Sequence, residues 1–429
     1  MNITKLCLLL ITAIMLPFSL TSQNVELLET RVDTLENEVT SLDKTLKRLS
    51  AFRISGLLQG DLQHGQPAAS LRVGAPNESS DNSFNRFGMR RARLTFAYNE
   101  NIAFTSIQIE FIESGIETRN LLFGLRDPWT YRNDFTAGVF ILPFGHEAGI
   151  SNPILESPER STMIQTLFPG ERDLGGMFTL RAPENHALSF ITMNFAVTAG
   201  NGMNRETDNQ RNFIARLRAQ KSIGTDISWI AGVSYYSGKV HNPTGHFYEL
   251  SGTSFSKVVN NATGTYMKRE YFGLNAEFKL NSSVGETTLR GETIWGTQPG
   301  TASSSRSHSY NRLPENIDAN ALYKRPFTGY SLFFIQRISE SPFSTVVKYD
   351  SYDPNTGLDG NQIGAEDSMT SATDLWRNVL GLGLSYEPTA QIRLLGYYEI
   401  ISNEKSSLIE GYSTDRKDNA FTLRVQYRF

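Results

Sequence analysis

Basic side chains at alternate positions are the part of this sequence whose residue types and spacing point most directly to chemistry. Arg91 and Arg93 lie two residues apart in one stretch, and Arg216 and Arg218 do so in another. In an extended strand, such pairs project from the same face. Guanidinium groups bind phosphate and carboxylate oxygens well, because their planar donors match the geometry of these oxyanions. The pattern therefore predicts a surface that attracts small anions.

The other residues that could react do not combine into a site. The histidines all fall in predicted loops or turns, so none stands on a strand beside a serine, as a hydrolase would need; they are His64, His146, His186, His241, His246 and His308. No cysteine or second histidine pair completes a metal site around His241 and His246. Residues 353–367, DPNTGLDGNQIGAED, are similar to a calcium loop, but Gly364 stands where the bidentate glutamate belongs. We therefore expect no enzyme activity, no metal and no cofactor.

Composition narrows the class of protein further. The 429 residues carry 41 Lys and Arg against 44 Asp and Glu, a net charge of -3, which argues against nucleic acid as a partner. Residues 1–22 combine Lys5 with an apolar run from Leu6 to Leu16, which predicts a cleaved signal peptide. The only cysteine, Cys7, lies within it, so the exported chain would contain no thiol. No later stretch approaches the roughly 18 apolar residues of a membrane helix.

The segment 23–50 shows a heptad pattern. Its apolar residues follow a 3-4 spacing with charged residues between them: Val25, Leu28, Val32, Leu35, Val39, Leu42, Leu46 and Leu49. This pattern predicts a coiled coil, and the alternative is a single amphipathic helix packed on a globular core. Valine at the first position and leucine at the second favour two strands, but three strands remain open.

The segment 51–429 changes to a period of two, which is typical of strands. We count sixteen alternating segments, beginning near residues 52, 87, 102, 119, 134, 176, 187, 212, 227, 267, 286, 327, 343, 375, 391 and 419. The links after even segments are short, such as 99–101 and 387–390, whereas most links after odd segments are long, such as 64–86, 145–174 and 238–265. Short turns on one rim and long loops on the other indicate an all-β fold, a 16-stranded antiparallel transmembrane β-barrel.

The final segment illustrates the two faces of such a wall. Its alternate residues would face lipid, namely Phe421, Leu423, Val425, Tyr427 and Phe429, while Arg424 and Arg428 would face a wet lumen. In a closed barrel this strand pairs with the first one, so that no backbone group is left unpaired in lipid. An aromatic strand that ends on Phe429 is similar to the assembly signal of bacterial outer-membrane barrels. We therefore expect the barrel assembly machinery and outer-membrane lipid as partners.

The barrel region as a whole resembles the family of phosphate-selective porins O and P. The residues that carry the resemblance are RRARL (90–94), AGVFILPFGHE (137–147), ESPERS (156–161), GERDLGG (170–176), TAGNGMN (198–204), VVKYDSYDP (346–354) and FTLRVQYRF (421–429). The resemblance implies a trimeric sixteen-stranded barrel, passive permeation of anions, and a third loop, 145–174, that folds into the lumen. It also implies that the coiled coil lies in the periplasm.

The strand map assigns thirteen basic residues to the lumen: Arg53, Arg91, Arg93, Arg126, Arg216, Arg218, Arg269, Lys279, Arg290, Lys348, Arg393, Arg424 and Arg428. It assigns six acids there: Asp61, Glu110, Glu277, Glu292, Asp350 and Glu399. A net cationic lumen favours anions, and the alternative is that the arginines brace the wall through ion pairs. Loop 145–174 adds Arg160 and Arg172 but also five acids, which places phosphate specificity in doubt.

These inferences combine into one expectation, an outer-membrane porin for small anionic solutes, with phosphate as one candidate. The expected selectivity residues are Arg91, Arg93, Arg160, Arg172, Arg216, Arg218, Arg290 and Lys348, and Phe429 is the expected assembly signal. The expected order is a signal peptide (1–22), a periplasmic coiled coil (23–50) and a barrel (51–429), assembled as a homotrimer. Two alternatives stay open: a general or sugar-selective porin, and a plugged structural or adhesive barrel.

Overall fold

The chain changes from helix to strand where the period of its apolar residues changes. The structure is a computed structural model, and it describes residues 22–75, 81–113, 115–204, 206, 208–260, 265–307 and 321–429. The predicted signal peptide lies outside these residues, apart from Ser22. One compact unit ends at Phe52 and the other runs from Arg53 to Phe429.

The first unit contains one helix, α2 (Ser22–Ala51), which covers the heptad segment. Its apolar residues form a stripe that nothing in the described chain covers, with 52% of Val32, 60% of Leu42 and 63% of Leu49 exposed. A stripe of this kind is stable in water when a partner helix buries it. The helix is confirmed, and the coiled coil stays a prediction. Among the described residues, no helix is both long enough and apolar enough to cross a membrane.

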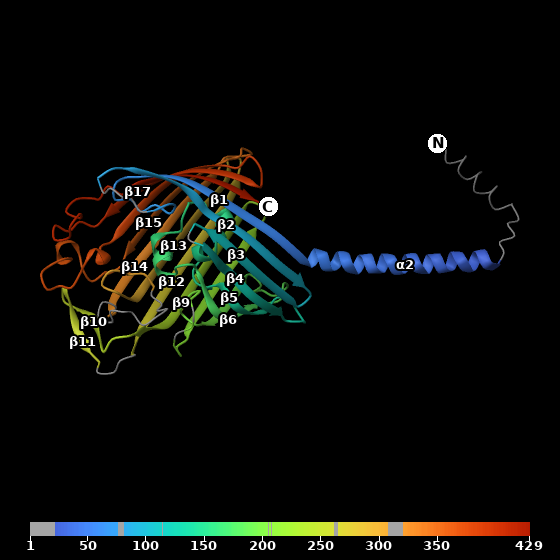
Figure 1. Ribbon diagram of the computed structural model, residues 1–429, viewed down its shortest axis with the longest axis horizontal. Coiled ribbons are helices and arrows are strands. Elements are labelled where there is room, and N and C mark those ends of the chain that lie inside the picture. The colour runs from blue at the N-terminus through green and yellow to red at the C-terminus, as the bar shows by residue number, and fades with distance from the viewer. Residues whose placement is uncertain are drawn as a thin grey trace. The chain divides into compact units, whose positions relative to one another are not determined.

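The second unit is a closed barrel whose wall consists of sixteen antiparallel strands (Figure 1). The wall strands are β1 (Phe52–Gly65), β2 (Phe84–Glu100), β3 (Ala103–Ile112), β4 (Gly115–Arg126), β5 (Asp134–Ile141), β6 (Arg172–Arg181), β7 (Ile191–Thr198), β8 (Asn212–Ile223), β9 (Ile227–Asn242), β12 (Thr265–Ser282), β13 (Gly285–Gly300), β14 (Tyr323–Arg337), β15 (Phe343–Asp353), β16 (Arg377–Tyr386), β17 (Ile392–Asn403) and β18 (Ala420–Arg428). The predicted fold class is confirmed, and each predicted strand begins within four residues of an observed one.

The last strand closes the barrel against the first. β18 pairs with β1 in a register that sets Arg424 opposite Asp61. The pairing continues beyond the strand, because the Gly56 and Phe429 backbones exchange two hydrogen bonds of 2.9 and 3.1 Å. Alternate residues of β18 face outward, such as Val425 with 52% exposed, while Arg424 between them keeps 4%. The predicted two faces of this strand are confirmed.

The connections separate by rim, as predicted, with one exception and one addition. The exception is the link between β3 and β4, which spans only residues 113 and 114 although it follows an odd strand. The addition lies in the predicted loop 238–265, where β10 (His246–Ser251) and β11 (Ser254–Val259) form a hairpin. Gly252 allows its tight turn with a φ of 63°. The Gly- and Asn-rich composition of this stretch predicts an irregular loop, and the hairpin corrects that prediction.

The longest insertion into the lumen is the segment 142–171 between β5 and β6, which we call the inserted loop. It contains the helix α3 (Thr162–Leu167) and two short 3-10 turns, Glu147–Gly149 and Asn152–Ile154. Two further 3-10 turns, Gly360–Gln362 and Ala372–Asp374, lie in the loop between β15 and β16.

Candidate functional site

The inserted loop leaves the wall at a glycine. Gly145 has a φ of 61°, in the left-handed region that glycine adopts without strain. A side chain there would collide with the Glu292 carboxylate of β13. That carboxylate accepts hydrogen bonds from the backbone N–H groups of His146 (3.1 Å) and Glu147 (2.8 Å), and so directs the loop into the lumen. The predicted folding of this loop into the barrel is confirmed.

An aromatic cluster fixes one end of the inserted loop to the wall. Phe144 and Phe168 of the loop contact each other with ring centroids 4.9 Å apart, and Phe168 meets Tyr271 of β12 edge to face at 5.7 Å. Tyr271 also stacks on Tyr236 of β9 at 5.0 Å. These rings are almost fully buried. Each buried aromatic side chain contributes about 1.5–3 kcal/mol, so this contact holds the loop firmly on the side of β9 and β12.

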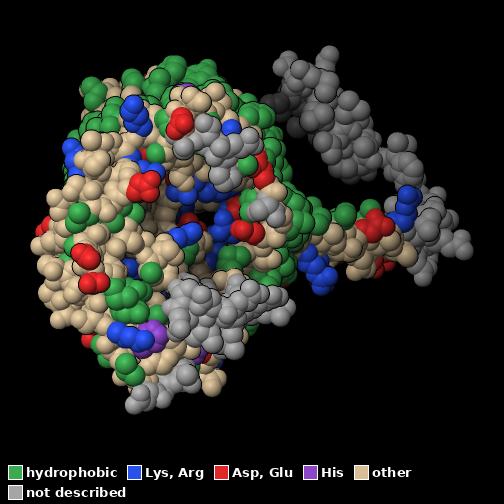
Figure 2. Space-filling model, turned by 60° about the vertical axis from the view of Figure 1, so that its left-hand side comes forward, with side chains coloured by type: hydrophobic (Ala, Val, Ile, Leu, Met, Phe, Trp, Pro, Cys, Tyr) green, Lys and Arg blue, Asp and Glu red, His purple; other side chains and the backbone are tan. Residues whose placement is uncertain are grey.

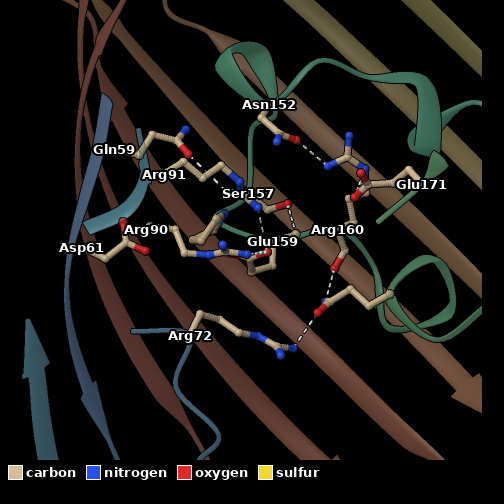
Figure 3. Close-up of polar contacts among 12 residues, drawn as sticks. Gln59, Asp61, Arg72, Arg90, Arg91, Asn152, Ser157, Glu159, Arg160 and Glu171 are labelled. Carbon is tan, nitrogen blue, oxygen red and sulfur yellow. Dashed lines mark hydrogen bonds and ion pairs between the residues drawn. The ribbon is translucent and has the colours of Figure 1, made fainter. Parts of the chain in front are cut away.

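Glu159 fixes the loop to the opposite wall (Figure 3). Arg90 of β2 binds its carboxylate with two hydrogen bonds, of 2.7 and 2.9 Å. Arg91 of β2 and Arg424 of β18 approach the same carboxylate at 3.4 and 3.5 Å. Burial would raise the pKa of Glu159, but the charges of Arg91, Arg90 and Arg424 outweigh it and hold the pKa well below its ordinary value. The carboxylate is therefore ionised near neutral pH.

The other acids of the inserted loop are also engaged. Glu156 accepts two hydrogen bonds of 3.0 Å from Arg290 of β13. Glu171 forms ion pairs with Arg172 (3.1 Å) and Arg160 (3.5 Å). Glu147 is fully buried and accepts bonds from the N–H and hydroxyl of Ser161. The acids that argued against phosphate specificity are thus largely bound to arginines or used to shape the loop.

A cavity of about 680 Å³ remains beside the loop, and arginine dominates its lining. Seven arginines line it, namely Arg72, Arg90, Arg91, Arg119, Arg172, Arg269 and Arg306, against the four acids Glu117, Glu159, Glu171 and Asp173. Figure 2 shows Lys and Arg side chains around the hollow at the centre of the loop-bearing face. We call this space the main cavity. In general, an excess of cations in a lumen lowers the energy of anions and raises that of cations.

The structure separates the eight predicted selectivity residues into groups. Arg91 and Arg172 line the main cavity. Arg160 lies within the loop and donates to Asn152 at 2.7 Å. Arg93, Arg290 and Lys348 are buried in the wall and contact Glu110, Glu277 and Asp350 respectively. For these three residues the geometry matches the bracing alternative, because each is bound to an acid.

Arg216 and Arg218 differ from the other six. Both lie on β8, and no carboxylate of the described residues comes within 4 Å of either, since Arg216 donates to Asn194 (2.9 Å) and the Gly145 carbonyl (3.2 Å). Arg218 donates to Gln220 at 2.9 Å, and its Nε has no partner in the described chain. These two arginines therefore keep an uncompensated positive charge in the lumen.

Four arginines that line the main cavity are not among the predicted selectivity residues, namely Arg72, Arg90, Arg119 and Arg306. Arg72 and Arg306 lie in loops, for which strand alternation gives no direction. Arg119 lies where the pairing of β3 with β4 shifts register between Ile107 and Ile109, so strict alternation misplaces its side chain. Only Arg90 carried a signal, because it stands beside Arg91 in the RRARL motif.

Solved structures share this architecture. The outer membrane channel DcaP of Acinetobacter baumannii aligns with a TM-score of 0.56 and 12% identity, covering 88% of this chain and 97% of that chain. An anion-selective porin from Comamonas acidovorans gives 0.54 and 11%, covering 88% and 99%. OmpF of Salmonella typhi gives 0.54 and 10%, covering 88% and 97%. No family model and no curated protein matches the sequence. The chain thus has the barrel fold of outer-membrane porins.

Proposed function

We propose that this protein is an outer-membrane diffusion channel that prefers small anionic solutes, with phosphate among the candidates. In this proposal the long loops face the exterior and the short turns face the periplasm. A cleaved signal peptide directs export, α2 lies in the periplasm, and Phe429 belongs to the signal read by the barrel assembly machinery. Membership of the phosphate-selective family is part of the proposal.

The observation that supports the anion preference best is the pair of uncompensated arginines on β8. An arginine that forms an ion pair, such as Arg93 with Glu110, contributes little net charge at a distance, because the two charges largely cancel. Arg216 and Arg218 keep theirs, on a wall strand that also contacts the carbonyl of Gly145 in the inserted loop. Together with the excess of arginines over acids in the main cavity, seven against four, they give solutes a cationic path along the lumen. Such a path lowers the energy of an anion and raises that of a cation.

The pair offers a direct test of this proposal. Replacing Arg216 and Arg218 by glutamine should shift the reversal potential in a potassium chloride gradient toward cations, lowering the anion-to-cation permeability ratio by about twofold to fivefold. Both side chains form hydrogen bonds without an acid partner, so the barrel should remain folded. The measurement is made on purified protein in planar bilayers, with chloride, phosphate and a dicarboxylate in turn.

Lys221 supplies the matched control, because it lies on the same strand but on the opposite face. Lys221→Gln should leave the permeability ratio unchanged. A native channel that prefers cations would contradict the proposal, as would equal ratios in the native and Arg216/Arg218 variants. Folded protein without any conductance would favour the plugged structural or adhesive alternative.

The exposed stripe of α2 supports a second part of the proposal, that three copies associate and their helices form a coiled coil. Replacing Leu35 and Leu42 by aspartate should lower the temperature at which the detergent-solubilised oligomer dissociates, because charges cannot enter a coiled-coil seam. Light scattering coupled to size exclusion measures the oligomer mass. Thr34→Asp with Ser41→Asp adds the same charges to another face and should have no effect. Equal dissociation temperatures for both variants would exclude a role for the stripe.

A further inference from the structure

A second cavity, of about 240 Å³, lies between the inserted loop and the wall strands β16 and β17. Its charged lining includes Arg72 from the loop after β1, Arg377 at the start of β16 and Glu399 of β17. The other charged residues that line it are Glu159, Arg160, Arg306, Asp350 and Asp418. The side chain of Gln63 accepts bonds from the backbone N–H groups of Arg72 (2.7 Å) and Val73 (3.2 Å), which fixes this part of the loop against β1. We call this space the side cavity. Figure 3 shows Arg72 below Glu159.

Arg72, Arg377 and Glu399 form no ion pair with one another within 4 Å, whereas Asp350 and Glu159 are bound to other residues. The Arg377 Nε is enclosed by protein and has no hydrogen-bond partner in the described chain. No described residue forms a hydrogen bond with Glu399 or an ion pair with it within 4 Å, although Arg377 and Arg72 both lie within range of its charge. Arg72 donates to the side chain of Gln165 instead, at 2.5 Å. Lys348 is also near Glu399, but Asp350 binds it at 2.9 Å.

The wall itself keeps the opposite charges apart. In the pairing of β16 with β17, Arg377 lies opposite Asn403 and Glu399 lies opposite Gly381. Their backbones are therefore offset by four residues, which is about 13 Å at the usual rise of a strand. Opposite charges in a packed interior normally pair, because each is costly to leave alone. Here the positive charges of Arg72 and Arg377 and the negative charge of Glu399 line one cavity, which has the size of a small molecule.

We propose that the side cavity binds a small solute that carries an acidic group and an ammonium group together, the chemical class of the acidic amino acids. The acidic group binds Arg377 and Arg72, and the ammonium group binds Glu399. The inference rests on the proposed function, since the solute reaches the cavity through the lumen, and it adds the solute class. A plain dicarboxylate finds the same arginines but is repelled by Glu399.

Glutamate and glutarate are the probes that separate these cases, because they differ only in the ammonium group. Each is added to single channels in potassium chloride, and the concentration that halves the open current is measured. Glutamate should block at about fivefold lower concentration, which is the contribution of one solvent-accessible ion pair. A general preference for anions predicts the opposite order, because glutarate carries more negative charge. If glutamate and glutarate blocked the native channel at equal concentrations, or if glutarate blocked at the lower one, the inference would be overturned.

Two variants assign the effect to its residues. Glu399→Gln should remove the advantage of glutamate, and Arg377→Gln should weaken block by both probes. Glu184→Gln removes a carboxylate that is 83% exposed in the turn between β6 and β7, and it should leave the ratio of the two blocking concentrations unchanged. An unchanged ratio in Glu399→Gln would overturn the inference. Chloride selectivity, measured without either probe, tests the proposed function separately, so the failure of one is distinguishable from the failure of the other.

Discussion

Arg424→Gln is expected to destabilise the barrel by about 3–5 kcal/mol, the usual result of removing one partner from a buried ion pair. Arg424 of β18 binds the Asp61 carboxylate of β1 with hydrogen bonds of 2.7 and 2.8 Å, directly across the closure of the barrel. Asp61 is fully buried, so the variant leaves a buried charge without its cation. The same arginine donates to the Pro158 carbonyl of the inserted loop at 2.7 Å. Unfolding in urea, followed by tryptophan fluorescence of the detergent-folded protein, measures the loss.

Arg428→Gln is the matched control, because Arg428 lies on the same face of the same strand and donates to backbone carbonyls. We expect it to change the free energy of unfolding by less than about 1 kcal/mol. Asp61→Asn combined with Arg424→Gln should recover much of the loss, since no unpaired charge remains. A single Arg424→Gln variant as stable as the native barrel would show that water in the lumen already screens this pair.

The second large effect is expected from Glu159→Gln, which should loosen the inserted loop where it meets β2. The carboxylate binds Arg90 and also contacts Arg91 and Arg424. Hydrogen bonds to charged groups contribute about 1.5–3 kcal/mol each, so their loss weakens the hold of β2 on the loop. Arg290 still binds Glu156, and Arg424 still donates to the Pro158 carbonyl. The main cavity also loses one of its four acids. We expect a noisier open-channel current and an anion-to-cation permeability ratio about twofold higher, measured in planar bilayers.

Glu117→Gln separates the two consequences of that substitution. Glu117 lines the same cavity but is 45% exposed and lies 3.9 Å from Arg119, so its loss removes one charge without freeing the loop. It should raise the permeability ratio slightly and leave the current noise at the native level. If both variants gave the same noise, the loop would not depend on Glu159.

The wall of the barrel was predictable because its residues obey a local rule. Alternation placed Val425 outside and Arg424 inside without any knowledge of their neighbours. The site was predictable only in part, since it depends on contacts between distant segments. Glu159 contacts Arg424, which lies 265 positions away in the sequence, and no periodicity of the sequence predicts such a contact. Arg377 and Glu399 are ordinary strand residues in the sequence, and only the packed lumen sets them around one cavity.

The pairing of β18 with β1 also limits when folding can finish. Gln59 and Gln426 bond to each other although 367 positions separate them, so the ribosome must have made nearly the whole chain before the two can meet. Until then both outer strands offer unsatisfied backbone groups, which invite aggregation. Chaperones that bind the unfolded chain during secretion would prevent this aggregation.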